Sequence, residues 1–587
     1  MQKTTDKGNK NGKILNFTLE PSIYAKRGDA KRAQNDPVSA LSLYNDALNL
    51  DPHDLDTRLS AAELLTDMSR FNDSNRMLIP YMHEDPDFCK DSYCMVGFNL
   101  MGMGEFEGAR SCFNRFLDMT DEVSERTDAM LDALDFIDSL DEEPPLVTDA
   151  VLKKHDEKVQ EAHAAFDRGE YGRSAALLRE LVKADPDNKK LLYDLALSCL
   201  CSHEHEEGAE HIDRLLRIDP GNWPAWSLKL MYAKAQNNEI EIGRICRELE
   251  KCDTEQPDEL LRINGALMEA DCTELASVFA KRLVRLMPYD TLANHRLAIC
   301  HVRKREYAKA AEIYGKLLRI DRNDCIAKFY RAECLEAERD PKSALSKRKP
   351  MIQYQLPFDM IIARAKELLD SKTSSAEQLA AKWREDEDLR ETVRWAFTLH
   401  EFNITHAMMN LLRVVGGDEA EHLIRETMAD IDAGRSVVNE GMGILKRMEA
   451  EEPYFAMLEG SLLEGKVNII DMSNIRIPKQ YCDIFPRFHE KAANLYSAEI
   501  INTAAGIVER FIANTGGVFP KLTDRQSEAL SAAVEYLACD QCGAIASDDV
   551  FERYGVTRKR LMNAIERIVR TVVTGQQSSI PPKGDPE

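Results

Sequence analysis

The chain has 587 residues, of which 44% are hydrophobic and 30% are charged, and its formal net charge is −24 at pH 7. This length exceeds what one hydrophobic core serves, so we expect two to four folding units. An acidic surface repels phosphate backbones and anionic lipid, which argues against nucleic-acid or membrane binding by the chain as a whole.

The N-terminal residues 1–19 are mostly polar and carry several lysines. They lack the apolar core of a secretory signal, so we expect a disordered arm. No run of apolar residues is long enough to span a bilayer, so no membrane segment is expected. Fourteen cysteines without an export signal indicate free thiols in a reducing compartment. We therefore expect a cytoplasmic protein.

Helix endings recur along the chain with a spacing of 34 residues. Pro186 and Pro220 are 34 residues apart, and so are Pro288 and Arg322, two periods further on. The same spacing separates two prolines near the N-terminus. A fixed period of 34 residues is typical of a solenoid in which each repeat is one helix pair. The sequence therefore predicts a mostly helical repeat protein.

The residues within one period suit such a helix pair. Gly169 allows a tight turn between two helices, Tyr171 packs into the pair, and Pro186 ends the second helix because proline cannot continue it. In the unit over 291–324, the small side chain of Ala310 permits close approach of the paired helix. Tyr314 fills the space between repeats.

Glycines, small residues and aromatic residues recur at matching places in several units: Gly28, Ala40, Tyr44, Ala47 and Pro52; Gly104, Phe106, Ala109, Phe113 and Phe116; Trp226; Tyr307, Ala310 and Tyr314. Over roughly residues 20–355, in about seven to nine units, this pattern resembles the tetratricopeptide repeat family. The resemblance implies an all-α, right-handed superhelix. We divide it into segments 20–140 and 155–356, joined over 141–154 by an acidic, proline-containing linker or by a divergent helix pair.

In the family that this pattern resembles, the first helices of the units line a concave groove that holds a peptide or a partner's helix. The resemblance therefore implies a non-enzymatic scaffold or adaptor that binds a protein. Ala25 and Asp29 stand at positions of the family's carboxylate clamp, so that clamp is not expected. The groove residues that we expect are Lys190, Tyr193, Ser227, Lys234, His295, Arg303 and Arg331.

The expected groove lining becomes more basic toward the later units. A partner segment with acidic side chains or a free carboxylate would suit it. The alternative is that these are ordinary solvated residues, as charged and polar residues at a protein surface usually are.

From about residue 357 the 34-residue period is lost. Residues 357–484 keep helical spacing of apolar residues, except that alternation and glycines over 454–471 indicate a short β-hairpin. We expect a C-terminal helical domain over 485–575 and a disordered tail over 576–587.

One segment of this domain, 547–570, weakly resembles a helix-turn-helix. Gly555 suits the turn and Thr557 suits the cap of the next helix, but bulky Phe551 stands where a small residue is usual. Helix pairs of this kind are often purely structural, which is the interpretation that we favour. The alternative is a regulator whose repeats sense a partner and whose basic helix binds nucleic acid through Arg558, Lys559, Arg560 and Arg567.

Two groups of potential metal ligands do not satisfy the usual patterns. Cys539 and Cys542 form a CxxC without a second ligand pair. The densest group falls at the turn of one repeat, where polar residues are expected anyway: Cys199, Cys201, His203, His205 and His211. Since the sequence also lacks the common catalytic and nucleotide-binding motifs, we expect no metal, no cofactor and no enzymatic activity.

Overall fold

The computed structural model describes residues 20–120, 124–140, 150–340, 342–343, 345, 350–371, 376–467, 477–515, 519–542, 544, 546 and 550–577. The regular structure of these residues is helical apart from one two-stranded sheet. The expected arm over 1–19, most of the linker and most of the tail lie outside them. No helix in the described ranges has both the length and the apolar character needed to cross a bilayer.

Contacts within the chain define two compact units. The first comprises residues 1–70 and 131–365, and the second comprises 71–130 and 366–587. The expected segment 20–140 is therefore divided between the units. One reason is that Asp46 forms an ion pair of 2.7 Å with Arg322. Another is that Arg70 donates to the carbonyl of Tyr289, so residues 20–70 pack against the far end of the later repeats.

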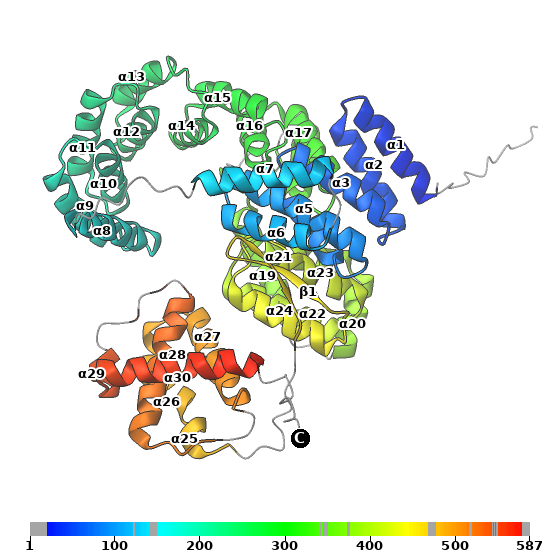
Figure 1. The fold of residues 1–587 in the computed structure, drawn as a ribbon. Helices are drawn as coiled ribbons and strands as arrows, with labels where there is room; N and C mark the ends of the chain where they lie inside the picture. Colours follow the sequence, from blue (N-terminus) through cyan, green and yellow to red (C-terminus); the bar gives the residue numbers. More distant parts are fainter. Residues whose placement is uncertain are drawn as a thin grey trace, which may run out of the picture. The chain divides into compact units, whose positions relative to one another are not determined.

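The first unit is built of helix pairs. Its helices are α1 (Pro21–Ala33), α2 (Pro37–Leu50), α3 (Leu55–Asp67), α8 (Ala150–Asp167), α9 (Tyr171–Ala184), α10 (Lys189–Cys201), α11 (His205–Ile218), α12 (Trp223–Ala235), α13 (Glu239–Leu249), α14 (Pro257–Glu269), α15 (Thr273–Leu286), α16 (Thr291–Arg303), α17 (Tyr307–Ile320) and α18 (Cys325–Arg339). In Figure 1 they form a curved row, with α10, α12 and α14 on its inner side and α11, α13 and α15 outside. These inner helices are the first helices of their pairs.

A left-handed residue separates the two helices of each pair. From Gly169 to Arg305 such residues follow at intervals of 34, through His203, Asn237 and Asp271, with φ between 52° and 76°. Each one lets the next amide bond back into the first helix, as Glu204 N does to the carbonyl of Cys199 at 2.8 Å. The predicted period therefore holds in the backbone, including the unit over 257–290 whose sequence is least typical.

The second unit begins with α4 (Phe71–Leu78), the 3₁₀ helix η1 (Ile79–Tyr81), α5 (Pro86–Met103) and α6 (Phe106–Asp118). The boundaries between units fall within α7 (Glu125–Leu140) and α19 (Phe358–Ser371). The next elements are α20 (Ala376–Glu385), α21 (Glu387–Phe397), α22 (Phe402–Val415), α23 (Asp418–Met428), α24 (Arg435–Arg447), β1 (Tyr454–Leu458) and β2 (Ser461–Gly465). Ala150 already begins α8, so the last residues of the expected linker are helical.

The β-hairpin forms within the predicted range and packs against α6. A Cβ atom added to Gly108 would lie 1.9 Å from the carbonyl oxygen of Gly460 at the hairpin tip, so only glycine fits there. Tyr93 donates to Glu464 of β2 at 2.9 Å. These contacts between distant segments explain why α4–α6 belong to the second unit.

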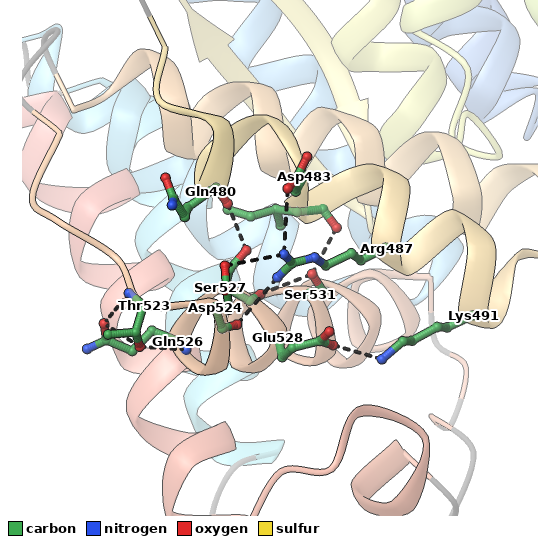
Figure 2. Close-up of polar contacts among 11 residues, drawn as sticks. Gln480, Asp483, Arg487, Lys491, Thr523, Asp524, Gln526, Ser527, Glu528 and Ser531 are labelled. Carbon is green, nitrogen blue, oxygen red and sulfur yellow. Dashed lines mark hydrogen bonds and ion pairs between the residues drawn. The ribbon is translucent and has the colours of Figure 1, made fainter.

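The C-terminal helices form a bundle around α28. They are α25 (Lys479–Cys482), α26 (Ile484–Ala492), the 3₁₀ helix η2 (Ala493–Leu495), α27 (Ala498–Ala513), α28 (Asp524–Gln541), α29 (Val550–Tyr554) and α30 (Arg558–Gln577). Figure 2 shows the contact of α28 with α25 and α26, where Ser527 donates to the carbonyl of Gln480 and Lys491 pairs with Glu528. Small side chains on α28, such as Ala532, allow this close approach.

Candidate peptide-binding groove

Residues 350–356, here called the strap, are a non-helical segment that lies against the first helices of the last two pairs. His295 Nε2, on α16, lies 3.0 Å from the carbonyl oxygen of Met351 and 3.1 Å from that of Gln353. The hydroxyl of Tyr330, on α18, donates to the carbonyl of Gln355 at 2.9 Å. Side chains of the two first helices therefore bind three backbone carbonyls of one extended segment.

These contacts fix the protonation state of His295. Carbonyl oxygens only accept, so Nε2 carries the proton and donates to the strap. Nδ1 then accepts from the hydroxyl of Tyr314 at 2.9 Å. The ring is fully buried, and burial lowers the pKa of His295 to about 4. Both ring nitrogens are thus satisfied in the neutral form.

An aromatic wall completes the site around the strap. The rings of Tyr314 and Tyr330 stack with centroids 5.5 Å apart. Tyr354 of the strap meets the ring of His295 edge-on at 5.0 Å, and its hydroxyl donates to Asp324. Burial raises the pKa of the Asp324 carboxyl. Together with Leu356, which is fully buried, these contacts make the strap an integral part of the first unit.

The strap corrects the expectation that the listed groove residues all lie on an open surface. His295 is not exposed because the strap covers it. Ser227 is also buried, and its hydroxyl donates to the carbonyl of Trp223 in its own helix. Arg303 is largely buried and donates to the carbonyl of Met268 in the preceding pair at 2.7 Å. These three side chains therefore hold the repeats or the strap together.

The remaining expected groove residues reach solvent. Lys190 and Arg331 are exposed, and Tyr193 and Lys234 are half-buried. Lys234 lies 3.6 Å from Asp271.

Arg262, on α14, was not among the expected residues, yet it reaches Tyr193 on α10. Its Nη1 donates to the Tyr193 hydroxyl at 3.3 Å, and its guanidinium lies over the ring. Its sequence signal is its place one residue after Leu261, which is one period from Ser227. The inner face of α10–α14 thus presents cationic groups and an aromatic ring.

The C-terminal basic helix has the predicted turn. Gly555 adopts a φ of 61°, and α30 begins at Arg558. Arg558, Lys559 and Arg560 are exposed, whereas Arg567 donates to the Tyr481 hydroxyl at 3.1 Å. The helix before the turn, α29, has only 5 residues. The side chains needed for nucleic-acid contact are therefore accessible at three of the four expected positions.

The expected group of soft and acidic ligands near residue 200 is an ion-pair network. Ligand atoms of Cys199, Glu204 and Glu207 lie within 4.8 Å of one another. Arg179 pairs with both carboxylates, at 2.7 Å to Glu207, so a guanidinium already neutralises them. His203 is exposed, at the left-handed position of its turn.

A family model described as tetratricopeptide repeat matches residues 159–222. Among solved structures, yeast Tom70 is 11% identical, with a TM-score of 0.26, and the match covers 96% of this chain and 97% of that one. PilF of Pseudomonas aeruginosa is 17% identical, with a TM-score of 0.25 and coverage of 33% and 96%. YrrB, described as a TPR protein with an unusual peptide-binding site, is 16% identical, with a TM-score of 0.24 and coverage of 32% and 97%. The search of curated proteins gave no match. TM-scores this low carry no argument about function.

Proposed function

Since the chain belongs to the tetratricopeptide-repeat family, we propose that it is a non-enzymatic scaffold that binds an extended segment of a protein partner along its inner face. The observation that supports this proposal is the strap. His295 and Tyr330 hold it through backbone carbonyls, which every peptide has. Recognition of backbone carbonyls by first helices is the kind of contact that an extended partner segment would make. A reducing compartment such as the cytoplasm suits the free cysteines of the chain.

The partner segment would bind on the N-terminal side of the strap, along α10, α12 and α14. The strap fills the face at α16 and α18, so that part is closed to another chain. Lys190 is exposed, and Arg262 lies over the ring of Tyr193. These groups attract carboxylates although the protein as a whole is acidic. We therefore propose an acidic extended segment as the ligand, with Lys234 and Arg331 toward the later pairs.

Binding of short acidic peptides to the full chain tests this proposal. Fluorescence anisotropy would compare Asp- and Glu-containing peptides with their Asn and Gln counterparts. Lys190→Glu combined with Arg262→Glu should weaken acidic-peptide binding about tenfold, a loss of about 1.4 kcal/mol. A matched control is Lys183→Glu with Arg285→Glu, on the outer helices α9 and α15, where both side chains are exposed. Equal weakening in both double variants would contradict a specific groove.

A second candidate function is a regulator that binds nucleic acid through α30. The observation that favours it is that Arg558, Lys559 and Arg560 are exposed in one helical turn and form no ion pair within the described part of the chain. Anisotropy of labelled duplex DNA with full-length protein tests it. Salt-dependent binding that Arg558→Ala with Arg560→Ala removes would support this function. Absence of binding at low salt would eliminate it.

A further inference from the structure

Two cysteines of the first unit lie in direct contact. Cys246 is on α13 and Cys272 is the N-cap residue of α15, and their sulfur atoms are 3.4 Å apart. Both side chains are partly exposed, so a small oxidant can reach them. The whole of α14 lies between them in the sequence. Neither residue takes part in the proposed groove.

The surroundings of the pair give the two thiols different acidities. The hydrogen bond that Cys246 donates lowers the pKa of Cys272 to about 7 and raises that of Cys246. Lys234 also favours the Cys272 thiolate, whereas Glu239 and Asp271 oppose it. Cys272 is therefore the better nucleophile near neutral pH, because the thiolate is the reactive form.

We propose that Cys246 and Cys272 form a disulfide when the protein meets a peroxide. In the first step the Cys272 thiolate attacks one peroxide oxygen and the O–O bond breaks. With hydrogen peroxide this leaves a sulfenic acid and, after protonation, one water. In the second step the Cys246 sulfur attacks the Cys272 sulfur, and the hydroxyl leaves with a proton as a second water. Two thiols are oxidised to one disulfide, and one peroxide is reduced to two waters.

The disulfide would join α13 to the start of α15 and enclose α14 in a covalent loop. A crosslink removes open conformations of the enclosed chain, so α14 should open less often after oxidation. This matters because α14 carries Arg262, the cation that reaches Tyr193 on the inner face. A dithiol reductant would reverse the change by thiol–disulfide exchange.

Thiol counting and peptide mapping of the full-length protein test this inference. After treatment with equimolar hydrogen peroxide, the denatured protein should show two fewer free thiols than the 14 cysteines of the sequence. The peptides of Cys246 and Cys272 should be joined, with the loss of two hydrogens, and a dithiol should restore them. Hydrogen exchange of α14 should slow in the oxidised form.

The variants Cys246→Ser and Cys272→Ser supply the controls. Neither should form the linked peptide, and Cys246→Ser should instead accumulate a sulfenic acid at Cys272 that a dimedone probe labels. Circular dichroism of each variant would establish that it is folded. The inference is overturned if the native protein keeps all its thiols, or if the linked peptides come from other cysteines.

Discussion

Acidification should release the strap because of His295. The folded-state pKa of His295 is about 4, against 6.5 for an unperturbed histidine. The unfolded or opened site therefore binds a proton more readily than the closed site. For this lowered pKa, the stabilisation is complete above pH 6.5 and is lost as the pH falls toward 4. The full loss is about 3.4 kcal/mol, since each pKa unit corresponds to about 1.36 kcal/mol.

At pH 5.0 the loss relative to pH 7.5 should be about 2 kcal/mol, which makes the open site about 30-fold more populated. Hydrogen exchange of full-length protein measures this locally, after correction for intrinsic exchange rates at the two pH values. Peptides from α16 and the strap should show the increase. The matched control is His295→Gln, whose amide can still donate to the strap and accept from Tyr314 without titrating.

The difference between the two proteins isolates the histidine from neighbouring groups such as Asp324, whose pKa is raised by burial and which titrates in both. The pH-dependent increase should be about 30-fold larger in the wild type than in His295→Gln. If both proteins show the same change between pH 7.5 and 5.0, the buried neutral histidine is not what makes the strap sensitive to acid.

Three substitutions test other contacts. Tyr330→Phe leaves a buried strap carbonyl without its donor, so local opening of the strap should become easier by about 1–3 kcal/mol; unchanged exchange in the strap would refute that contact. Gly108→Ala places a methyl group against the backbone of the hairpin tip and should destabilise the second unit by about 1–3 kcal/mol; an unaltered melting temperature would contradict this packing. Arg553→Met removes the partner of Glu535, which is fully buried and 2.8 Å away, and should cost about 3–5 kcal/mol in the C-terminal bundle, measured by urea unfolding, whereas a variant as stable as wild type would mean that the pair is dispensable.

The helix pairs could be predicted from the sequence because prolines and aromatic residues mark them. The left-handed residue of each turn is less visible, since only some units place glycine there. His203, Asn237, Asp271 and Arg305 adopt the same conformation as Gly169. The period is therefore more regular in the backbone than in the residue types, and this is why the unit over 257–290 looked degenerate.

The strap could not be predicted from periodicity. Its anchors are backbone carbonyls, which leave no trace in residue types, and His295 reaches them only in the folded repeats. A position that faces the groove in one unit can thus be covered by another part of the chain. The division into two units was also hidden, because it depends on contacts such as Arg76 with Glu426, which are 350 residues apart.

Photo-crosslinking tests the central claim of a peptide-binding inner face most directly. A photoreactive phenylalanine analogue would replace Tyr193 in the full chain, and a matched protein would carry it at Ile240 on α13, which is 87% exposed. With a labelled acidic peptide, the account predicts a crosslink from position 193 that unlabelled peptide competes away, and none from position 240. Equal labelling from both positions, or labelling from 240 alone, would contradict it.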